Sequence, residues 1–529
     1  MDNPGETVTR EQLQEKIWPS DTFVDFDHGT NNAIKRLREA LGDTAETPHY
    51  IETVPRRGYR FIGNIRSGDK RFHSIAVLPL QNLSRDPEQE YFVDGLTEAL
   101  INSLAKISAL RVISRTTAMF YKNVHKTLPE IARELGVEIL VEGSILRFGE
   151  RVRIAVQLIE AASDSHLWAE SYERDLRDVL QLQSEISRAV ASEIQAKLTP
   201  GEQEQLSRAR LVSPQVYEIY LRGRYHWNRR SADGFKKGTE YFLQAIQMDP
   251  NYAAAYAGLA DCAGSAGFWG FTSPEHGCGR AKAAAQKSLE IEETAEAHTS
   301  LGWALIHYDF DFVLAEKHFK RAIELNPGYA HAHQWYAHCL AYTNRLDEGL
   351  ERVKVALDID PLSLNVNTTH VGVLWLQRKY DLAIEYCQKA LELAPNFALL
   401  RWLLANLFQA SALHEKAINE RQWAVEAFGG APFFLAELGD SYAAAGKKDD
   451  ALRVVGQLRE LAGRSYVMAY WLVLIHAALD ERDQAFHWIE RSYQERSPTL
   501  SFLKVDPRLD NLRSDPRLGH YLRQLNLPV

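Results

Sequence analysis

The sequence predicts a multidomain α+β protein: a small mixed region, then an α/β region, then an all-α repeat array. Two observations carry this prediction. The periodicity of apolar residues along the chain changes near 66–71 and again near 199–214, and both of these segments are polar. The second half of the chain also repeats itself every 34 residues. A length of 529 residues allows about three to five domains. We expect the domains to span 1–66, 72–200 and 214–529.

Composition and charge narrow the class of protein. The chain is 45% hydrophobic and 25% charged, as in ordinary globular proteins. Its 61 Lys and Arg against 70 Asp and Glu give a net charge of −9, so any nucleic-acid contact requires a local basic patch. Only four cysteines occur, and none forms a CxxC motif. This pattern argues against a disulfide scaffold or a thiolate zinc site and fits a reducing compartment.

Targeting signals are not visible in the sequence. The first residues, MDNPGETVTREQLQEK, contain no apolar stretch of the kind that a signal peptide needs. The longest apolar run, 466–479, is shorter than the roughly 20 residues that span a bilayer. We therefore expect a cytoplasmic protein that does not enter a membrane.

The N-terminal region begins with two expected helices. Thr9 can cap the first, because Gln12 follows three residues later as in a capping box. A second helix is expected over 30–41, with Ile34, Leu37 and Leu41 on its apolar side. Its opposite face carries polar and charged side chains, namely Asn32, Lys35, Arg36 and Glu39.

A short hairpin is expected after these helices. Residues 50–54 and 58–62 alternate like strands on either side of Pro55, Arg56 and Arg57. The tip of this hairpin is therefore basic, and Gly58 beside it lets the backbone turn tightly. Asn, Lys and Arg on a helix can read base edges in the major groove, and guanidinium groups on a hairpin can hold phosphates.

The stretch TNNAIKRLREALGD, followed by YIETVPRRGYRF, resembles the OmpR/PhoB-type winged-helix domain, and within it the CadC-like transcription activators. The resemblance implies a winged helix-turn-helix that binds double-stranded promoter DNA. The expected DNA-binding residues are Asn31, Asn32, Lys35, Arg36, Arg38, Arg56, Arg57 and Arg60. The alternative interpretation of the same residues is a solvated charged helix beside an ordinary hairpin.

Domains of this type normally open with a small β-sheet and a further helix before the segment that corresponds to 9–18. Only eight residues precede Thr9 in this sequence. We therefore expect an N-terminally incomplete domain that binds DNA weakly.

The middle region alternates strands and helices. Strands are expected at 74–80, 110–114, 138–146, 151–159 and 166–172. Helices are expected at 94–106, 128–135 and 178–198. The phrases IAVLPLQNLSRDPEQEYFVDGLTEAL and LVEGSI resemble the TolB N-terminal-like domain. This resemblance implies a non-catalytic module for interaction or ligand sensing.

The repeats of the second half are marked by small residues and prolines at a spacing of 34, for example Ala322 and Ala356 with Pro327 and Pro361. The same phase continues through Ser288, Ala390, Ala424, Leu458 and Ser492. Further alanines lie seven residues before four markers, at Ala383, Ala417, Ala451 and Ala485. The offset of 43 from Ala245 to Ser288 indicates an insertion of about nine residues near 267–277.

This period resembles the tetratricopeptide (TPR) family, which implies a solenoid of about eight helix pairs. A TPR groove usually binds a peptide, so we expect a protein partner there. Trp335, Tyr336 and Trp402 are candidates for lining the groove, although stacking in the core is the more common role of such side chains.

No catalytic, cofactor-binding or metal-binding residues are expected. The sequence contains no GxxxxGK[ST], GxGxxG, GxSxG or HExxH motif. A cluster in one repeat helix, formed by His331, His333, His338 and Cys339, is better explained by packing than by a metal. The carboxylates at 86, 88, 90 and 94 are interpreted as solvated loop charges.

The sequence therefore predicts a one-component DNA-binding transcriptional regulator whose α/β and TPR regions receive a signal, and a homodimer is one expected form of it. The winged-helix type is shared with phosphorelay regulators, but no receiver domain or phosphorylation site is evident. The alternative is a TPR interaction scaffold that has lost DNA binding. A third hypothesis, an enzyme subunit such as a cyclase regulator, is disfavoured because no catalytic domain is visible.

Overall fold

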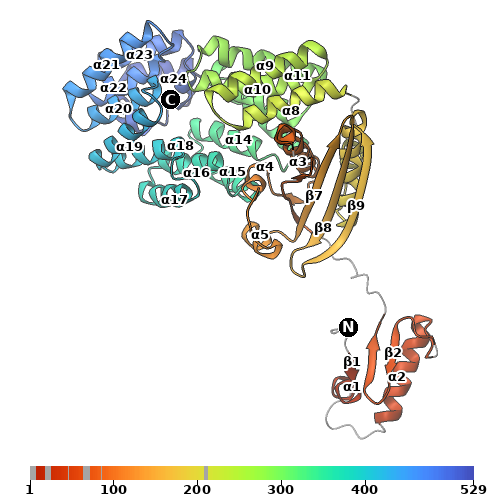
Figure 1. Cartoon of the computed structure of the whole chain (residues 1–529). Coiled ribbons are helices and arrows are strands. Elements are labelled where there is room, and N and C mark those ends of the chain that lie inside the picture. The colour runs from red at the N-terminus through yellow and green to blue at the C-terminus, as the bar shows by residue number, and fades with distance from the viewer. Residues whose placement is uncertain (1–6, 18–25, 46, 63–71, 85, 208–211) are drawn as a thin grey trace. The chain divides into compact units, whose positions relative to one another are not determined.

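The computed structural model describes residues 7–17, 26–45, 47–62, 72–84, 86–207 and 212–529 (Figure 1). The chain divides into two compact units, Met1–Arg71 and Phe72–Val529. We call them unit 1 and unit 2 and describe each by itself.

Unit 1 contains helices α1 (Arg10–Ile17) and α2 (Phe26–Leu41) and a three-stranded antiparallel sheet. Its strands are β1 (Thr7–Thr9), β2 (Ile51–Val54) and β3 (Gly58–Phe61), in the order β1-β3-β2. The expected capping box is confirmed, because Gln12 N donates to Thr9 Oγ1 at 3.2 Å and Thr9 N to Gln12 Oε1 at 2.8 Å.

Helix α2 differs from the prediction at two points. It starts at Phe26 rather than Thr30, because a helix interior accepts a glycine such as Gly29 at a cost of only about 1 kcal/mol. Leu37 was expected on the apolar face but is 41% exposed. Instead, hydrogen bonds of Asn31 and Arg38 attach α2 to other described elements of unit 1.

The α/β part of unit 2 is built on a mixed sheet in the order β6-β4-β7-β8-β9, with β5 paired to β7. Its strands are β4 (Ser74–Val77), β5 (Gln81–Asn82), β6 (Arg111–Val112), β7 (Ile139–Phe148), β8 (Arg151–Glu160) and β9 (Ser165–Asp175). The β4 strand is parallel to β6 and β7, whereas β7, β8 and β9 are antiparallel.

Helices cover both faces of the inner strands. Helices α3 (Glu90–Leu104) and α6 (Val179–Glu193) share one core cluster with Ile75 and Val77. Helix α5 (Leu128–Leu135) packs on the other face against Ala76 and Leu78. A short helix, α4 (Arg115–Met119), was not expected.

The expected closing helix over 178–198 ends earlier than predicted, and a separate helix follows it. Helix α6 ends at Glu193, and α7 spans Pro200–Ser207. Between them Gln195 has a φ of 52°, a left-handed backbone angle that an α-helix cannot continue.

In the described part of unit 2, eight helix pairs follow the α/β part. The first four are α8 (Pro214–Asn228) with α9 (Ala232–Met248), α10 (Ala253–Phe268) with α11 (Arg280–Ile291), α12 (Ala295–Ala304) with α13 (Phe312–Leu325), and α14 (Ala330–Tyr342) with α15 (Leu346–Ile359). The next four are α16 (Leu364–Leu376) with α17 (Tyr380–Leu393), α18 (Ala398–Ala410) with α19 (His414–Ala427), α20 (Pro432–Ala444) with α21 (Lys448–Ala462), and α22 (Ala469–Ala478) with α23 (Arg482–Gln494).

The residues that mark the repeat lie on the second helix of each pair and are buried, for example Ala322, Ala356 and Leu458, all 0% exposed. Small side chains there let neighbouring helices approach closely. The expected insertion is confirmed between α10 and α11, where η3 (Glu275–Gly279) forms a turn of π-helix. A Cβ on Gly277 would lie 2.3 Å from Gly267 Cα, so these two backbones touch.

The repeat array curls back on itself. After α23 come η5 (Pro498–Phe502), η6 (Pro507–Leu512) and α24 (Pro516–Gln524). This C-terminal segment reaches the second and third pairs, since the ring centroids of Phe502 and Phe268 are 6.5 Å apart and Asn526 Nδ2 donates to Phe310 O at 3.2 Å. Figure 1 shows the blue C-terminal helices beside the green helices α9 and α10.

The α/β part is held against the repeats by direct contacts. Ser114 N donates to Ile359 O at 2.9 Å, and Thr117 Oγ1 donates to Asp360 Oδ1 at 2.7 Å. Near α8, Arg224 Nε donates to Glu98 Oε1 at 3.1 Å. Burial would raise the pKa of Glu98, but the charges of Arg224 and Arg115 outweigh it and lower that pKa.

A membrane-spanning helix was also sought. Of the helices in the part of the chain that the structure describes, each is too short or too polar to cross a bilayer.

Candidate nucleic-acid interface

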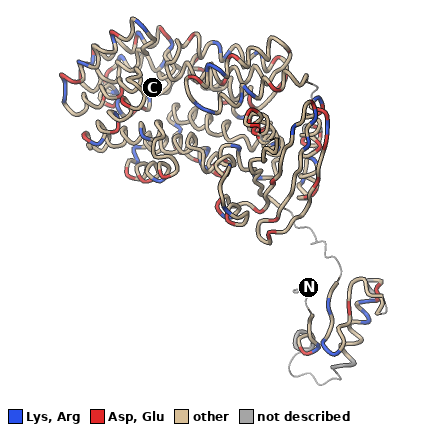
Figure 2. Tube along the Cα trace, in the orientation of Figure 1, with Lys and Arg blue, Asp and Glu red and all other residues tan. Residues whose placement is uncertain are grey.

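The outward face of α2 carries three polar side chains that are free to meet a ligand. Asn32, Lys35 and Arg36 are exposed. Their spacing of three and four residues places them on one side of the helix. Lys35 lies 4.0 Å from Glu39 in an exposed ion pair, which a phosphate could replace. Figure 2 shows Lys and Arg positions in blue along the tube of unit 1.

Other residues expected to bind DNA make contacts inside unit 1. Asn31 Oδ1 accepts hydrogen bonds from Tyr59 OH at 2.8 Å and from Arg10 Nη2 at 3.1 Å. Arg38 Nη2 donates to Ile51 O at 2.7 Å and to Thr53 Oγ1 at 2.9 Å. These contacts join α2 to α1 and to the sheet.

Arg60 is held in a similar way within the sheet. Its Nη2 donates to Thr7 Oγ1 at 3.1 Å, and its Nη1 lies 3.5 Å from Glu52 Oε2. The side chain is half-buried, so part of it still faces outward.

The loop from α2 to β2 is ordered by Asp43. Its carboxylate accepts hydrogen bonds from the backbone N–H groups of His49 at 2.7 Å, Ile51 at 2.8 Å and Tyr50 at 3.2 Å. The bond from His49, together with the other two, lowers the pKa of Asp43. This side chain fixes where the hairpin starts relative to α2, and the sequence analysis did not identify it.

The hairpin tip presents Arg56 and Arg57, which are both exposed. Arg56 has a φ of 61°, and Arg57 N donates to Val54 O at 3.1 Å to close the turn. Gly58 has a φ of 156°, as its expected role in the turn allows, and it is needed for a second reason. A Cβ there would lie 2.0 Å from Val8 O, so the glycine lets β1 approach β3.

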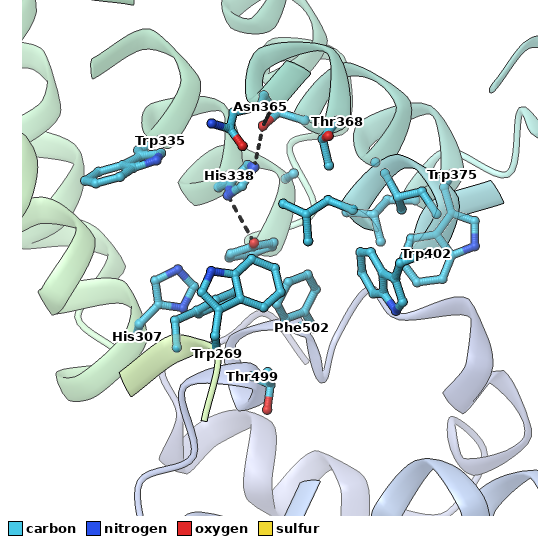
Figure 3. Close-up of a pocket in the computed structure, with 18 of the residues that line it drawn as sticks. Trp269, His307, Trp335, His338, Asn365, Thr368, Trp375, Trp402, Thr499 and Phe502 are labelled. Atoms are coloured by element: carbon cyan, nitrogen blue, oxygen red, sulfur yellow. Dashed lines mark hydrogen bonds between the residues drawn. The ribbon is translucent and has the colours of Figure 1, made fainter. Parts of the chain in front are cut away.

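A second candidate site is a cavity of about 200 Å³ inside the curled repeat array. Figure 3 shows its aromatic lining, and we call it the aromatic cavity. Trp335 and Trp402 line it as expected, whereas Tyr336 is buried at 4% exposure and donates to Glu316 Oε1 at 2.7 Å. Further aromatic lining residues that sequence reasoning missed are Trp269, Trp303, Trp375, Phe433, Trp471 and Phe502.

The histidines of α14 do not share a partner. His331 Nε2 lies 3.0 Å from Arg230 Nη2, His333 Nε2 lies 2.9 Å from Pro327 O, and His338 Nε2 lies 3.0 Å from Thr369 Oγ1. Cys339 is buried and faces Phe312 O at 3.6 Å. Within the described ranges no group of His, Cys, Asp and Glu side chains has the arrangement of a metal site.

The interpretation of Glu90 and Asp94 as solvated loop charges is wrong. Because α3 starts at Glu90, both side chains are helical, and Lys122 Nζ contacts each at 2.6 Å. Asp86 does lie in a loop, where its Oδ1 accepts a hydrogen bond from Glu88 N at 2.9 Å.

Family models match successive parts of the chain. Residues 1–61 match "Transcriptional regulatory protein, C terminal", and residues 71–189 match "HilA/YgeH-like transcriptional regulator, second domain". Residues 309–367 and 372–397 match tetratricopeptide repeats.

The curated relatives include transcriptional regulators and a protein named as an adenylate cyclase. The chain is 22% identical to transcriptional regulator HilA of Salmonella typhimurium over 395 residues, which cover 73% of this chain and 68% of HilA. It is 38% identical over 61 residues to the cholera toxin homolog transcriptional activator of Vibrio parahaemolyticus, covering 12% of this chain and 21% of the activator. A Rhizobium meliloti protein named "Putative adenylate cyclase 3" is 39% identical over 187 residues, 35% of this chain and 32% of that protein.

The helix, the hairpin and these matches define a winged-helix transcriptional regulator that carries TPR repeats. The OmpR/PhoB-type domain, the HilA/YgeH-like domain and the similarity to HilA and to the Vibrio activator support the interpretation of the chain as a CadC-like regulator. The TolB-like resemblance of the middle region stays a prediction. The regulator matches favour a non-enzyme, and the cyclase match spans only a third of that relative.

Proposed function

We propose that the chain is a one-component regulator in which unit 1 binds promoter DNA and unit 2 receives the signal. The observation that supports this most directly is that α2 carries two sets of polar side chains, one attached within unit 1 and one exposed. Asn31 and Arg38 fasten the helix to its neighbours, while Asn32, Lys35 and Arg36 stay exposed. A helix held in this way can enter the major groove without losing its own supports.

The eight expected DNA-binding residues have three roles in this proposal. Asn32, Lys35 and Arg36 read or approach bases, and Arg56 and Arg57 hold phosphate. The other three, Asn31, Arg38 and Arg60, position the helix and the wing through their internal contacts. We also propose domain boundaries at 1–66, 72–200 and 214–529.

The separate roles proposed for unit 1 and unit 2 also indicate the binding partners of the chain. We propose that unit 2 binds a protein through its repeats and that two copies of the chain bind one operator. Light scattering of the complex with a selected DNA site would give the number of copies. We further propose that the chain has no enzymatic activity of its own.

Replacing Asn32 with Ala is expected to weaken specific DNA binding five- to a hundredfold, about 1–3 kcal/mol, because a bidentate base contact is lost. The measurement is a binding titration against a site selected from a random DNA library by the full chain. Random DNA should bind almost as before, and thermal stability should not change. Asn31→Ala is the contrast, because losing its two internal bonds should lower stability. Equal losses on both DNAs would exclude Asn32 as a reader.

Replacing both Arg56 and Arg57 with Ala is expected to make the affinity for DNA depend less steeply on salt concentration. Each lost phosphate contact reduces the slope of log K against log salt by about 0.9, so the slope should fall by roughly 2. Arg133→Ala with Arg188→Ala, two exposed arginines of unit 2, should leave the slope unchanged. A steep slope that is insensitive to the hairpin pair would contradict the assignment of the wing.

A further inference from the structure

The aromatic cavity is assembled from parts of the chain that are far apart in sequence. Trp335, Trp375 and Trp402 come from α14, α16 and α18, and Phe502 comes from the C-terminal segment. Trp269 comes from the inserted loop after α10. Figure 3 shows these rings gathered around one space, with Asn365 and Thr368 at the same wall.

The aromatic rings contact one another in two rows. In one row the ring centroids of Trp402 and Phe433 are 6.1 Å apart, and those of Phe433 and Trp269 are 5.7 Å apart. In the other row Phe502 lies 4.5 Å from Tyr342 and 6.5 Å from Phe268. Flat faces and edges at these spacings suit the offset or edge-on stacking of another planar ring.

The cavity offers little uncompensated charge. Burial lowers the pKa of His307 to about 3 and that of His338 to about 4, so both imidazoles are neutral at pH 7. Glu437 and Arg508, which also line it, are paired at 3.1 Å. Arg230 lies at the wall but stacks over the Trp227 ring at 3.6 Å. A neutral ligand therefore fits the wall better than an ionic one.

Some polar groups of the wall remain available. The side-chain amide of Asn365 makes no hydrogen bond to any residue that the structure describes. The indole N–H groups of Trp375 and Trp402 also have no partner in the described ranges, but both nitrogen atoms are fully buried, so Asn365 is the group that a ligand can reach. A polar atom on an otherwise apolar ligand would satisfy such a group and fix the ligand's orientation.

Size favours a small molecule over a peptide. An engineered cavity of about 150 Å³ holds benzene, so about 200 Å³ accommodates one or two rings. The C-terminal segment contributes Thr499, Phe502 and Arg508 to the lining. A Cβ on Gly270 would lie 2.9 Å from the Trp471 ring, so the inserted loop packs directly against α22.

We propose that the aromatic cavity binds a neutral, planar molecule of one or two rings that carries a hydrogen-bonding group. This binding is a property of unit 2 and does not require that unit 1 binds DNA. A failure of DNA binding and a failure of ligand binding are therefore distinguishable.

The test is a calorimetric titration of the full chain with coumarin, a neutral two-ring compound with a carbonyl oxygen. Saturable binding of one coumarin per chain is expected, with a rise in melting temperature. Gly372 lines the cavity, and a Cβ there would have 4.0 Å of clearance to Leu403 Cδ1. Gly372→Leu should therefore fill the cavity and raise the dissociation constant at least tenfold.

Gly456→Leu is the matched control. Gly456 also lies in a helix interior, but it is exposed, and nothing lies within 4 Å of its added Cβ. This variant should bind coumarin like the unchanged chain. If Gly372→Leu does not fold, Trp402→Leu compared with Trp423→Leu serves the same purpose, because Trp423 does not line the cavity.

Three results would overturn the proposal. The first is no saturable binding of coumarin up to its solubility limit. The second is equal binding by Gly372→Leu and Gly456→Leu. The third is tighter binding of coumarin-3-carboxylate, or of an extended peptide, than of coumarin, since that would assign the cavity to an anionic or a peptide ligand.

Discussion

Replacing Arg508 with Ala is expected to lower the free energy of unfolding of unit 2 by about 3–5 kcal/mol, because it leaves buried carboxylates without their cation. Arg508 Nη2 lies 2.8 Å from Asp506 Oδ2, and Nη1 lies 3.1 Å from Glu437 Oε1 and 3.8 Å from Asp440 Oδ2. These three carboxylates are at most 2% exposed. Urea unfolding of the full chain, followed by tryptophan fluorescence, measures the loss.

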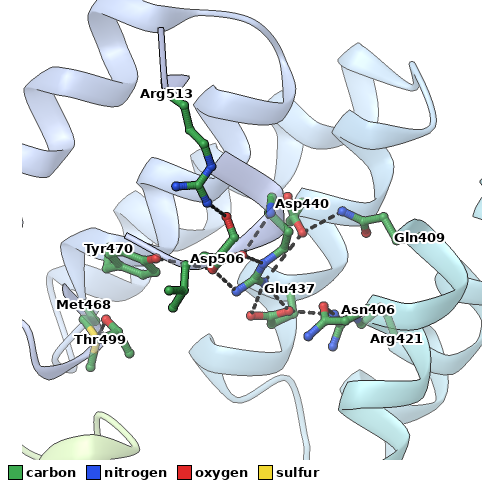
Figure 4. A network of polar contacts seen from close by, with 12 residues as sticks. Asn406, Gln409, Arg421, Glu437, Asp440, Met468, Tyr470, Thr499, Asp506 and Arg513 are labelled. Carbon is green, nitrogen blue, oxygen red and sulfur yellow. Dashed lines mark hydrogen bonds and ion pairs between the residues drawn. The ribbon is translucent and has the colours of Figure 1, made fainter. Parts of the chain in front are cut away.

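The polar network around Arg508 joins three helix pairs to the C-terminal segment (Figure 4). Arg421 Nη2 lies 2.7 Å from Glu437 Oε2, and Gln409 Nε2 donates to Asp440 Oδ2 at 3.0 Å. Tyr470 OH donates to Asp506 Oδ2 at 3.3 Å. Asp440 Oδ1 has no hydrogen-bond partner among the described residues, and neither have the donors Arg421 Nε and Nη1.

The free energy of unfolding that Arg508→Ala removes should increase with pH. Burial raises the pKa of Asp440 to about 6, so this group favours folding when it is protonated and that contribution disappears as the pH rises through about 6. The charge of Arg508 lowers the pKa of Asp440, so without Arg508 this carboxyl group should hold its proton to still higher pH. The difference between the variant and the unchanged chain should therefore be smaller at pH 5 than at pH 8.

Arg453→Ala is the control for this prediction. Arg453 makes a 2.7 Å ion pair with Asp450, but its side chain is 66% exposed. Its removal should leave the urea midpoint almost unchanged. A loss below about 1 kcal/mol for Arg508→Ala, or an equal loss at both pH values, would show that the network does not stabilise the curled array.

Replacing Gly58 with Ala is expected to separate β1 from β3 and to destabilise unit 1 by about 1–3 kcal/mol or more. The added Cβ would lie 2.0 Å from Val8 O and 2.9 Å from Thr9 Cα, and both are backbone atoms that cannot rotate away. Hydrogen exchange of the full chain should show faster exchange at residues 7–9 and 58–61, with weaker binding to the selected DNA site.

Gly42→Ala gives the matched comparison in the same unit. Gly42 has a φ of 65°, but nothing lies within 4 Å of its added Cβ. Only the backbone strain of about 1 kcal/mol applies there, so exchange in β1 and β3 should not change. If Gly58→Ala leaves the exchange of β1 as slow as before, the close approach of these strands does not constrain the wing.

Local patterns were enough to predict most of the elements. A 34-residue period reports on neighbouring helices only, because each helix pair of a solenoid packs against the next. The small residues at the marked positions were therefore placed correctly on the buried second helices. The polar face of α2 could also be predicted from the sequence, because a helix places side chains three and four residues apart on one side.

The sequence by itself determined the order of domains, the number of repeats and the exposed face of α2. Tertiary structure alone decided which of the expected DNA-binding residues already have partners within unit 1, because the hydrogen-bond partners of Asn31, Arg38 and Arg60 lie 13 to 53 residues away in the chain. It also decided that rings from Trp269 to Phe502 enclose one cavity. A periodic pattern fixes how each helix pair meets its neighbours, whereas the curvature summed over eight pairs brings the array's ends together.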